Sequence, residues 1–291
     1  MIPDPLAPLA DLPGVADAVA RARAACEELR WHEGFRRRWR EVRAEASVRS
    51  ACASAGVEGA RLPVAALREV ARGAAPVPRD AAGAVAFGAL RAAAEVERLF
   101  PDLGSRDRSP LPPFGQLLAR LHSAATAEPD DASTRPRAGQ PLVGRPRGDL
   151  PPRDLAGLGP APSGTEVAAR LDVLGEVVRT SRSPALIVAA VVHGELLALR
   201  PFAHGSGIVA RAMSRLLVVE RGLDPTGAVV AEVGWLGSVN AYLGAAAGFA
   251  TGTPAGVGAW LVACADAVRA GADEGREIAD AVLAQRLGGT A

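Results

Sequence analysis

The sequence contains no lysine, and all 33 of its Lys-or-Arg residues are arginines. This absence excludes every mechanism that needs a lysine, including a Schiff base, a lysine general base and the phosphate-binding lysine of a P-loop. The three cysteines, Cys26, Cys52 and Cys264, are too few and too far apart for a disulfide framework or a zinc site. They indicate buried thiols in a reducing compartment. Together with abundant alanine, the use of arginine alone is typical of a high-GC bacterium.

Long apolar runs and an excess of one charge are also lacking. Residues 183–199 come closest to a membrane span, but His193 and Glu195 interrupt the run, so we expect a buried helix there. The N-terminus has no basic start followed by an apolar run, which predicts no signal peptide and a cytoplasmic location. The net charge of +1 gives no indication of nucleic acid, and we expect neither nucleic-acid nor membrane binding.

Strand signals are scarce. Aromatic residues make up 4% of the chain, and most apolar residues recur at the spacing of amphipathic helices. Residues 128–164 break this pattern because they are dense in proline, glycine, arginine and aspartate. A loop of this length is usually functional or disordered. The sequence therefore predicts an all-α protein with one long irregular insertion.

The stretch LRPFAHGSGIVAR, residues 199–211, places a glycine turn between two predicted helices. Gly205 and Gly207 permit a tight turn, and the free N–H groups at the start of the following helix attract an anion. Arg211 lies about one turn into that helix, close enough to bind the same anion. The alternative is a helix–helix turn without a ligand, in which Arg211 forms a structural ion pair.

This stretch resembles the signature of the Fic (Fido) family, His-x-Phe-x-(Asp/Glu)-Gly-Asn-Gly-Arg-x-x-Arg. Phe202, Gly205, Gly207 and Arg211 match it. The flanking segments are similar in the same order, including the predicted helix that carries His193 and the proline-rich stretch where the family has a substrate-docking flap. The resemblance implies a Fic-type helical core at residues 110–265, an N-terminal helical region at 1–109 and a C-terminal helix at 266–291.

A second motif is similar to the inhibitory helix of many Fic proteins, (Ser/Thr)-x-x-x-Glu-(Gly/Asn). Ser54, Glu58 and Gly59 match it, in a helix expected near residues 47–59. The resemblance implies that Glu58 pairs with Arg211 and holds the N-terminal helix on the core. Removal of one partner from a fully desolvated pair of this kind would be strongly destabilising. The alternative is a solvent-exposed glutamate of little energetic consequence.

Active Fic proteins typically transfer AMP from ATP to a hydroxyl of a target protein. Here Arg200 stands at the position of the family's proton-accepting histidine, and a guanidinium cannot accept a proton near neutral pH. His204 stands at the position of the metal-binding acid, and imidazole is a poor ligand for Mg²⁺, so no metal site is expected. Ser206 and Ile208 replace the family's asparagine and first arginine. The resemblance therefore implies a degenerate active site.

The resemblance still implies an anion- or nucleotide-binding set. ATP or another nucleotide is its candidate ligand. The set comprises the turn and the helix after it, together with a later helix that borders the nucleotide base in the family: Gly205, Ser206, Gly207, Arg211, Asn240 and Tyr242.

Other roles for the changed residues stay open. His204 titrates in the range of a general base and is one candidate to replace the missing histidine; the alternative is a polar loop residue. Arg200 either strengthens anion binding or pairs with a carboxylate such as Glu195 or Glu58 and blocks the site. His193 lies seven residues before Arg200, roughly 10 Å along a helix, and we expect it to be buried with a backbone partner.

Three functions follow from this reading. The first is a Fic-type protein that is silent in AMP transfer and binds a nucleotide, another anion or a regulatory protein partner. The second is an active transferase of altered chemistry acting on a protein target. The third is a structural or dimerising module without a ligand, because Fic relatives often form homodimers.

Overall fold

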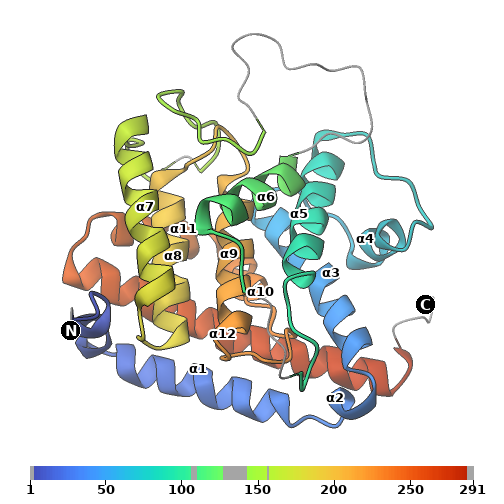
Figure 1. The fold of residues 1–291 in the computed structure, drawn as a ribbon. Coiled ribbons are helices and arrows are strands. Elements are labelled where there is room, and N and C mark those ends of the chain that lie inside the picture. The colour runs from blue at the N-terminus through green and yellow to red at the C-terminus, as the bar shows by residue number, and fades with distance from the viewer. Residues whose placement is uncertain (1–2, 106–109, 127–142, 156, 287–291) are drawn as a thin grey trace.

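The computed structural model describes residues 3–105, 110–126, 143–155 and 157–286. These residues form helices connected by turns and loops, and no strand occurs among them, which confirms the predicted all-α class. Figure 1 shows the arrangement. The elements in chain order are η1 (Ala7–Asp11), α1 (Val15–Arg30), α2 (Gly34–Arg37), α3 (Trp39–Val57), α4 (Val64–Ala71), α5 (Ala81–Glu97), α6 (Phe114–Thr126), α7 (Gly164–Thr180), α8 (Ala185–Leu199), α9 (Ser206–Glu220), α10 (Glu232–Gly237), α11 (Val239–Ala250) and α12 (Pro254–Leu283).

The centre of the fold is the pair α8 and α9, which pack along each other. Nearly every residue of α8 is buried, as expected for a helix that is apolar around its whole circumference. The side chain of Trp260 is fully buried, and its indole N–H donates to the Ala190 carbonyl at 2.8 Å, which fixes α12 against α8. The apolar run at 183–199 is thus a core helix, as predicted.

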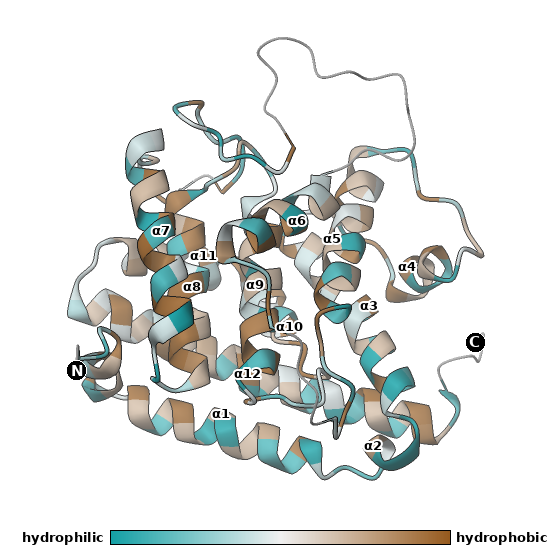
Figure 2. Cartoon of the chain, in the orientation of Figure 1, coloured by the Kyte–Doolittle hydropathy of each residue, from teal (hydrophilic) through white to brown (hydrophobic). Residues whose placement is uncertain are grey.

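The other helices surround this pair. Figure 1 shows α12 running across one end of α8 and α9, with α1 lying along it. The buried residues of α1 recur every three or four positions, Val15, Ala18, Ala22, Cys26 and Leu29. Its other faces are hydrophilic, and this alternation is visible along α1 in Figure 2. Residues 265 and 266, where a boundary was predicted between core and C-terminal helix, both lie inside the continuous helix α12.

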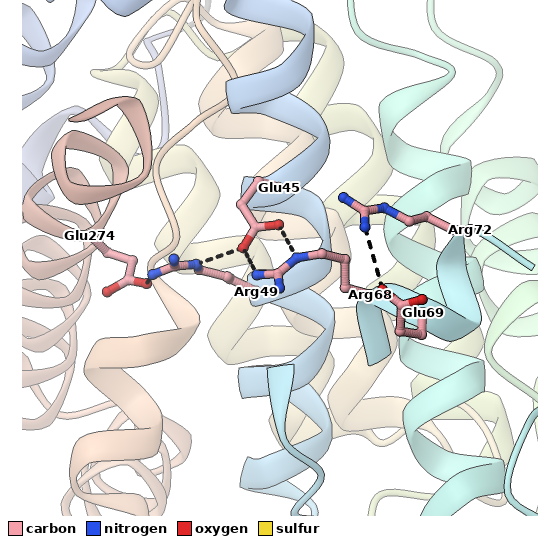
Figure 3. Close-up of polar contacts among 6 residues, drawn as sticks. All are labelled: Glu45, Arg49, Arg68, Glu69, Arg72 and Glu274. Atoms are coloured by element: carbon pink, nitrogen blue, oxygen red, sulfur yellow. Dashed lines mark hydrogen bonds and ion pairs between the residues drawn. The ribbon is translucent and has the colours of Figure 1, made fainter. Parts of the chain in front are cut away.

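Ion pairs fasten the N-terminal helices to the core (Figure 3). Glu45 of α3 is almost completely buried and accepts two hydrogen bonds from Arg68 of α4, at 2.8 and 2.6 Å. Arg49 lies between Glu45, at 3.0 Å, and Glu274 of α12, at 2.6 Å. The pKa of Glu45 is lowered because Arg68 and Arg49 outweigh the opposing effect of burial. These contacts hold α3 in the position from which it reaches the predicted site.

The irregular insertion is only partly described. Residues 127–142 and 156 lie outside the described part of the chain. Residues 143–155 and 157–163, called the flap segment below, contain no helix or strand and lie over the turn between α8 and α9. No helix of the described residues is long and apolar enough to cross a bilayer.

Candidate functional site

The turn between α8 and α9 has two residues in the left-handed region. α8 ends at Leu199, and Arg200 follows with φ 44° and ψ 64°. Gly205 is the N-cap of α9 with φ 78°. Glycine adopts this conformation without cost, whereas it is unfavourable for arginine by about 1–2 kcal/mol. The predicted glycine turn is therefore present, and it carries backbone strain at Arg200.

The start of α9 holds a carboxylate of the same chain. The backbone N–H of Ser206 donates to Oδ2 of Asp154 in the flap segment, at 2.8 Å. The side chain of Ser206 is fully buried and hydrogen-bonds back to Phe202. A negative group at this position is stabilised by the helix dipole and the free N–H groups. The anion-binding position predicted from the sequence is thus occupied by Asp154.

Asp154 itself is placed at a cost. Its second oxygen, Oδ1, is buried and has no hydrogen-bond partner within the described residues. Burial and the neighbouring Glu58 carboxylate raise the pKa of Asp154 to about 6, against the opposing effect of the Ser206 N–H. The carboxylate therefore carries its charge at neutral pH and loses it in mild acid.

Arg211 lies deeper in the same helix and forms the expected ion pair. Its Nη2 is 2.6 Å from Oε1 of Glu58; the arginine side chain is 0% exposed and the glutamate side chain 17%. Ser54 accepts two further hydrogen bonds from this guanidinium, at its hydroxyl (2.8 Å) and its carbonyl (3.1 Å). Although burial opposes the charge, Glu58 and Tyr242 raise the pKa of Arg211.

The inhibitory-type motif lies at the C-terminal end of α3, and this position directs Glu58 toward Arg211. Glu58 directly follows α3, and Gly59 turns the chain with φ 88°. A Cβ atom at Gly207 would overlap Oε1 of Glu58, so the glycine at this position lets the carboxylate approach. The structure thus brings Ser54, Glu58, Gly207 and Arg211 together, as the resemblance implied. Their inhibitory and nucleotide-binding roles stay predictions.

Arg200 does not pair with either predicted carboxylate. Glu195 binds Arg170 of α7 at 2.8 Å and Glu58 binds Arg211, so both are engaged elsewhere. The Arg200 side chain is 5% exposed, and its Nη2 donates to the Gly159 carbonyl at 2.9 Å. Its Nε is buried without a partner in the described residues. Burial and the nearby Arg147 lower the pKa of Arg200.

Arg147 is a site residue that the sequence did not reveal. It is 6% exposed, and its backbone N–H donates to Pro201 O at 2.8 Å. Its guanidinium donates to five carbonyls, those of Gly148, Leu150, Pro162, Leu199 and Arg200. A second backbone bond joins Arg153 N–H to Ala203 O at 2.7 Å. The flap segment is thereby attached to the turn on both sides of Phe202.

His204 lies on the exposed side of the turn. Although the residue is exposed overall, partial burial of its ring and then the nearby Arg153 lower its pKa, which favours the neutral form. Its backbone carbonyl accepts a hydrogen bond from His122 Nε2 at 3.2 Å, while His122 Nδ1 accepts one from the Gly144 N–H at 2.8 Å. The His122 ring stacks on Phe202 at 3.9 Å, so His122 packs the turn against α6.

His193 is buried as predicted, but its partner is a side chain rather than the backbone. Its Nε2 lies 2.9 Å from the hydroxyl of Tyr242, and its Nδ1 has no partner among the described residues. Burial and then Arg211 lower the pKa of His193 well below its usual value. The Tyr242 hydroxyl also accepts from Arg211 Nη1 at 3.5 Å. Because Tyr242 is 4% exposed, it is closed to a nucleotide here, whereas Asn240 is exposed on α11.

Asp154 also escaped prediction, since nothing distinguishes it from the other acidic residues of the insertion. The one sequence signal for Asp154 and Arg147 is that both lie in the proline-rich segment that the resemblance assigns to a flap.

In the described part of the chain, no three His, Cys, Asp or Glu residues are grouped to hold a metal ion.

Comparison with solved structures defines the fold. No protein-family model and no curated protein matches the sequence. A Fic family protein from Desulfovibrio desulfuricans G20 has a TM-score of 0.61 and 21% identity, over 87% of this chain and 73% of that one. Fic-1 from C. elegans (residues 134–508) has a TM-score of 0.65 and 15% identity, over 94% and 74% of the two chains.

A Fic domain containing signaling protein from Bacteroides thetaiotaomicron VPI-5482 has a TM-score of 0.59 and 13% identity, over 90% of this chain and 98% of that one. The three structures agree with the resemblance drawn from the motif. The chain therefore has the fold of Fic family proteins.

Proposed function

We propose that this chain is a Fic-fold protein that does not transfer AMP and acts by binding a nucleotide, another anion or a protein partner. One observation carries the proposal: a strained, buried arginine, Arg200, stands where the proton acceptor of the reaction would be. An arginine cannot accept the proton of an attacking hydroxyl at neutral pH. Loss of a general base alone lowers a rate by about 10²–10⁴-fold.

The state of the α9 N-terminus supports the same conclusion. Asp154 accepts from the Ser206 N–H, and Glu58 accepts from Arg211, so two carboxylates are bound where phosphate groups would have to bind. The negative charges of Asp154 and Glu58 repel a nucleotide phosphate from the start of α9 until the flap segment or Glu58 moves. Any nucleotide binding at α9 therefore competes with the two carboxylates.

An altered transferase is the second candidate, because His204 is exposed and its pKa is lowered, so it is neutral at physiological pH as a general base must be. Absence of AMP transfer by the wild-type chain would eliminate this second function.

The test is incubation of the full chain with ATP labelled at the α-phosphate, Mg²⁺ and a bacterial lysate. We expect no protein label beyond that of the lysate alone. The assay control is a variant with the motif restored by Arg200→His, His204→Asp, Ser206→Asn and Ile208→Arg, combined with Glu58→Gly. Magnesium-dependent labelling by the wild-type chain would overturn the proposal, and its loss in His204→Ala would establish the altered transferase instead.

Binding is tested separately by calorimetry with ATP and ADP. We expect weak binding by the wild-type chain and tighter binding by the double variant Asp154→Asn, Glu58→Gly, because both competing charges are then removed. Absence of nucleotide binding by both proteins would favour the module without a nucleotide ligand.

A further inference from the structure

A cavity of about 390 Å³ lies between the flap segment and the end of α8. Arg147 and Arg200 line it, together with Asp149, Ser163 and prolines of the flap segment. The volume is within the range of small-molecule sites. All the lining residues belong to the described part of the chain, and none of them belongs to the Fic-type motif except Arg200.

The two arginines bring more positive charge to this cavity than its one lining carboxylate, Asp149, offsets. Both side chains are more than nine-tenths buried, and neither forms an ion pair in the described part of the chain. The donors of Arg147 go to carbonyl oxygens, which satisfy its hydrogen bonds but not its charge. The charges of Asp149 and Asp154 act on Arg147 and Arg200 respectively, but neither carboxylate forms an ion pair with these arginines. Asp149 Oδ1 instead accepts from the Gly164 N–H at the start of α7. Buried charges of like sign are costly unless a counter-ion is supplied.

Arg200 adds a second, independent observation. Its Nε is buried without an acceptor in the described residues, and its backbone is in the left-handed region. Buried guanidinium donors are nearly always satisfied, and strained residues persist where a function requires them. The Nε atom itself is closed to the cavity, but an anion there would contact the part of the Arg200 side chain that lines it and offset the positive charge of both guanidinium groups.

We propose that this cavity binds the phosphate group of a small molecule, with Arg200 donating to it directly and Arg147 supplying further positive charge. The arginine fork matches the oxygens of phosphate, and two guanidinium groups match a dianion better than a monocarboxylate. This inference deepens the proposed function by naming a ligand class and a place for it. This inference rests on the proposed function, because it assumes that the chain binds a phosphate compound and does not transfer AMP. The cavity is a different place from the Ser206 N–H, which Asp154 already occupies.

The test is calorimetric titration of the full chain with inorganic phosphate at constant ionic strength, with chloride as the reference. We expect saturable binding that Arg200→Gln weakens by about 10- to 100-fold, the effect of losing a hydrogen bond to a charged group. The control is Arg179→Gln on α7, whose side chain is 71% exposed. It removes the same charge at a distance and should leave the affinity within about twofold.

Asp149→Asn keeps an oxygen for the Gly164 N–H and removes a negative charge from the cavity, so it should tighten phosphate binding several-fold. This variant keeps the inference testable where Arg200→Gln does not fold. AMP and inorganic phosphate are compared in parallel: tighter binding of AMP identifies a nucleotide as the source of the phosphate group, and equal binding identifies the phosphate group alone as the recognised unit.

Three results would overturn the inference: no saturable phosphate binding by the wild-type chain, an equal loss in Arg200→Gln and Arg179→Gln, or weaker binding in Asp149→Asn. Failure here is distinct from failure of the proposed function. The latter is measured as transfer of label from ATP, and a protein that transfers no label can still lack this phosphate site.

Discussion

Two groups of arginines in this molecule are bonded in opposite ways. Between α3, α4 and α12, Arg49 and Arg68 are matched by two carboxylates, Glu45 and Glu274 (Figure 3). Where the flap segment meets the end of α8, the hydrogen bonds that Arg147 and Arg200 form with described residues go to carbonyls only, and the two arginines share a cavity. In a chain whose only strong cation is arginine, residue type alone cannot separate scaffold from site. The two groups differ in whether each arginine has a carboxylate partner within the fold and whether its backbone is free of strain.

The largest expected effect comes from Glu58→Ala, because it leaves the fully buried Arg211 without a carboxylate. We predict a loss of about 3–5 kcal/mol in the free energy of unfolding, measured by urea denaturation. The matched control is Glu176→Ala, which breaks an exposed pair with Arg179 and should cost less than about 1 kcal/mol. Equal losses of unfolding free energy in the two variants would show that the ion pair of Arg211 contributes no more than an exposed pair.

A smaller loss is expected from Glu45→Ala in the α3–α4–α12 network. The arginines left behind, Arg49 and Arg68, are about one-fifth exposed and can be partly solvated, so we predict about 2–3 kcal/mol. The pKa of Glu45 is lowered in the folded chain, so its contribution is present above the ordinary glutamate pKa and is lost as pH falls below it. Denaturation at pH 7 and pH 3 checks both points, and a variant whose deficit persists undiminished at pH 3 would contradict the assignment.

Asp154→Asn should act in the opposite direction. The pKa of Asp154 is raised to about 6, so the folded state binds its proton more tightly than the unfolded state does. The wild-type chain should therefore gain about 1 kcal/mol of stability as pH falls from about 7 to 5, and the full contribution of about 3 kcal/mol is reached only below the unfolded pKa of 3.8. The asparagine variant keeps an oxygen for the Ser206 N–H and should be more stable than wild type at pH 7. Melting temperatures across this range should show a slope in wild type that the variant lacks.

The smallest effect, and the sharpest contrast between the two arginine groups, is expected from Arg200→Gly. Glycine removes the left-handed strain and one uncompensated charge but also the bond to Gly159, so we predict a gain of about 1 kcal/mol. The comparison is Arg68→Ala, which should destabilise the fold because Glu45 loses its main partner. Thermal melts of the two variants decide the sign, and destabilisation by both would remove the distinction.

The helical core could be predicted from the sequence because its signals are local. The apolar run of α8, the glycine turn and the position of Glu58 after α3 all lie in short contiguous stretches. The pairing of Glu58 with Arg211 spans 153 positions and came only through the resemblance. The role of Arg200 stayed open between anion binding and pairing with a carboxylate, and Glu195, one of the candidate carboxylates, binds Arg170 of α7 instead.

Asp154 and Arg147 could not be predicted on physical grounds. They lie in a segment without helical or strand periodicity, and their contacts reach residues about 50 positions away. Nothing in the spacing of such a segment indicates which of its polar residues meets the core. The flap segment is placed by tertiary hydrogen bonds, not by local propensity.

The two backbone bonds that join the flap segment to the turn, Arg147 to Pro201 and Arg153 to Ala203, have a thermodynamic consequence. Lifting this segment away would withdraw Asp154 from Ser206 and dismantle one wall of the arginine-lined cavity in the same movement. A protein partner that grips the lifted segment and an anion that binds at the uncovered α9 terminus would therefore favour each other by equal free energies. A phosphate group held in the cavity would oppose both.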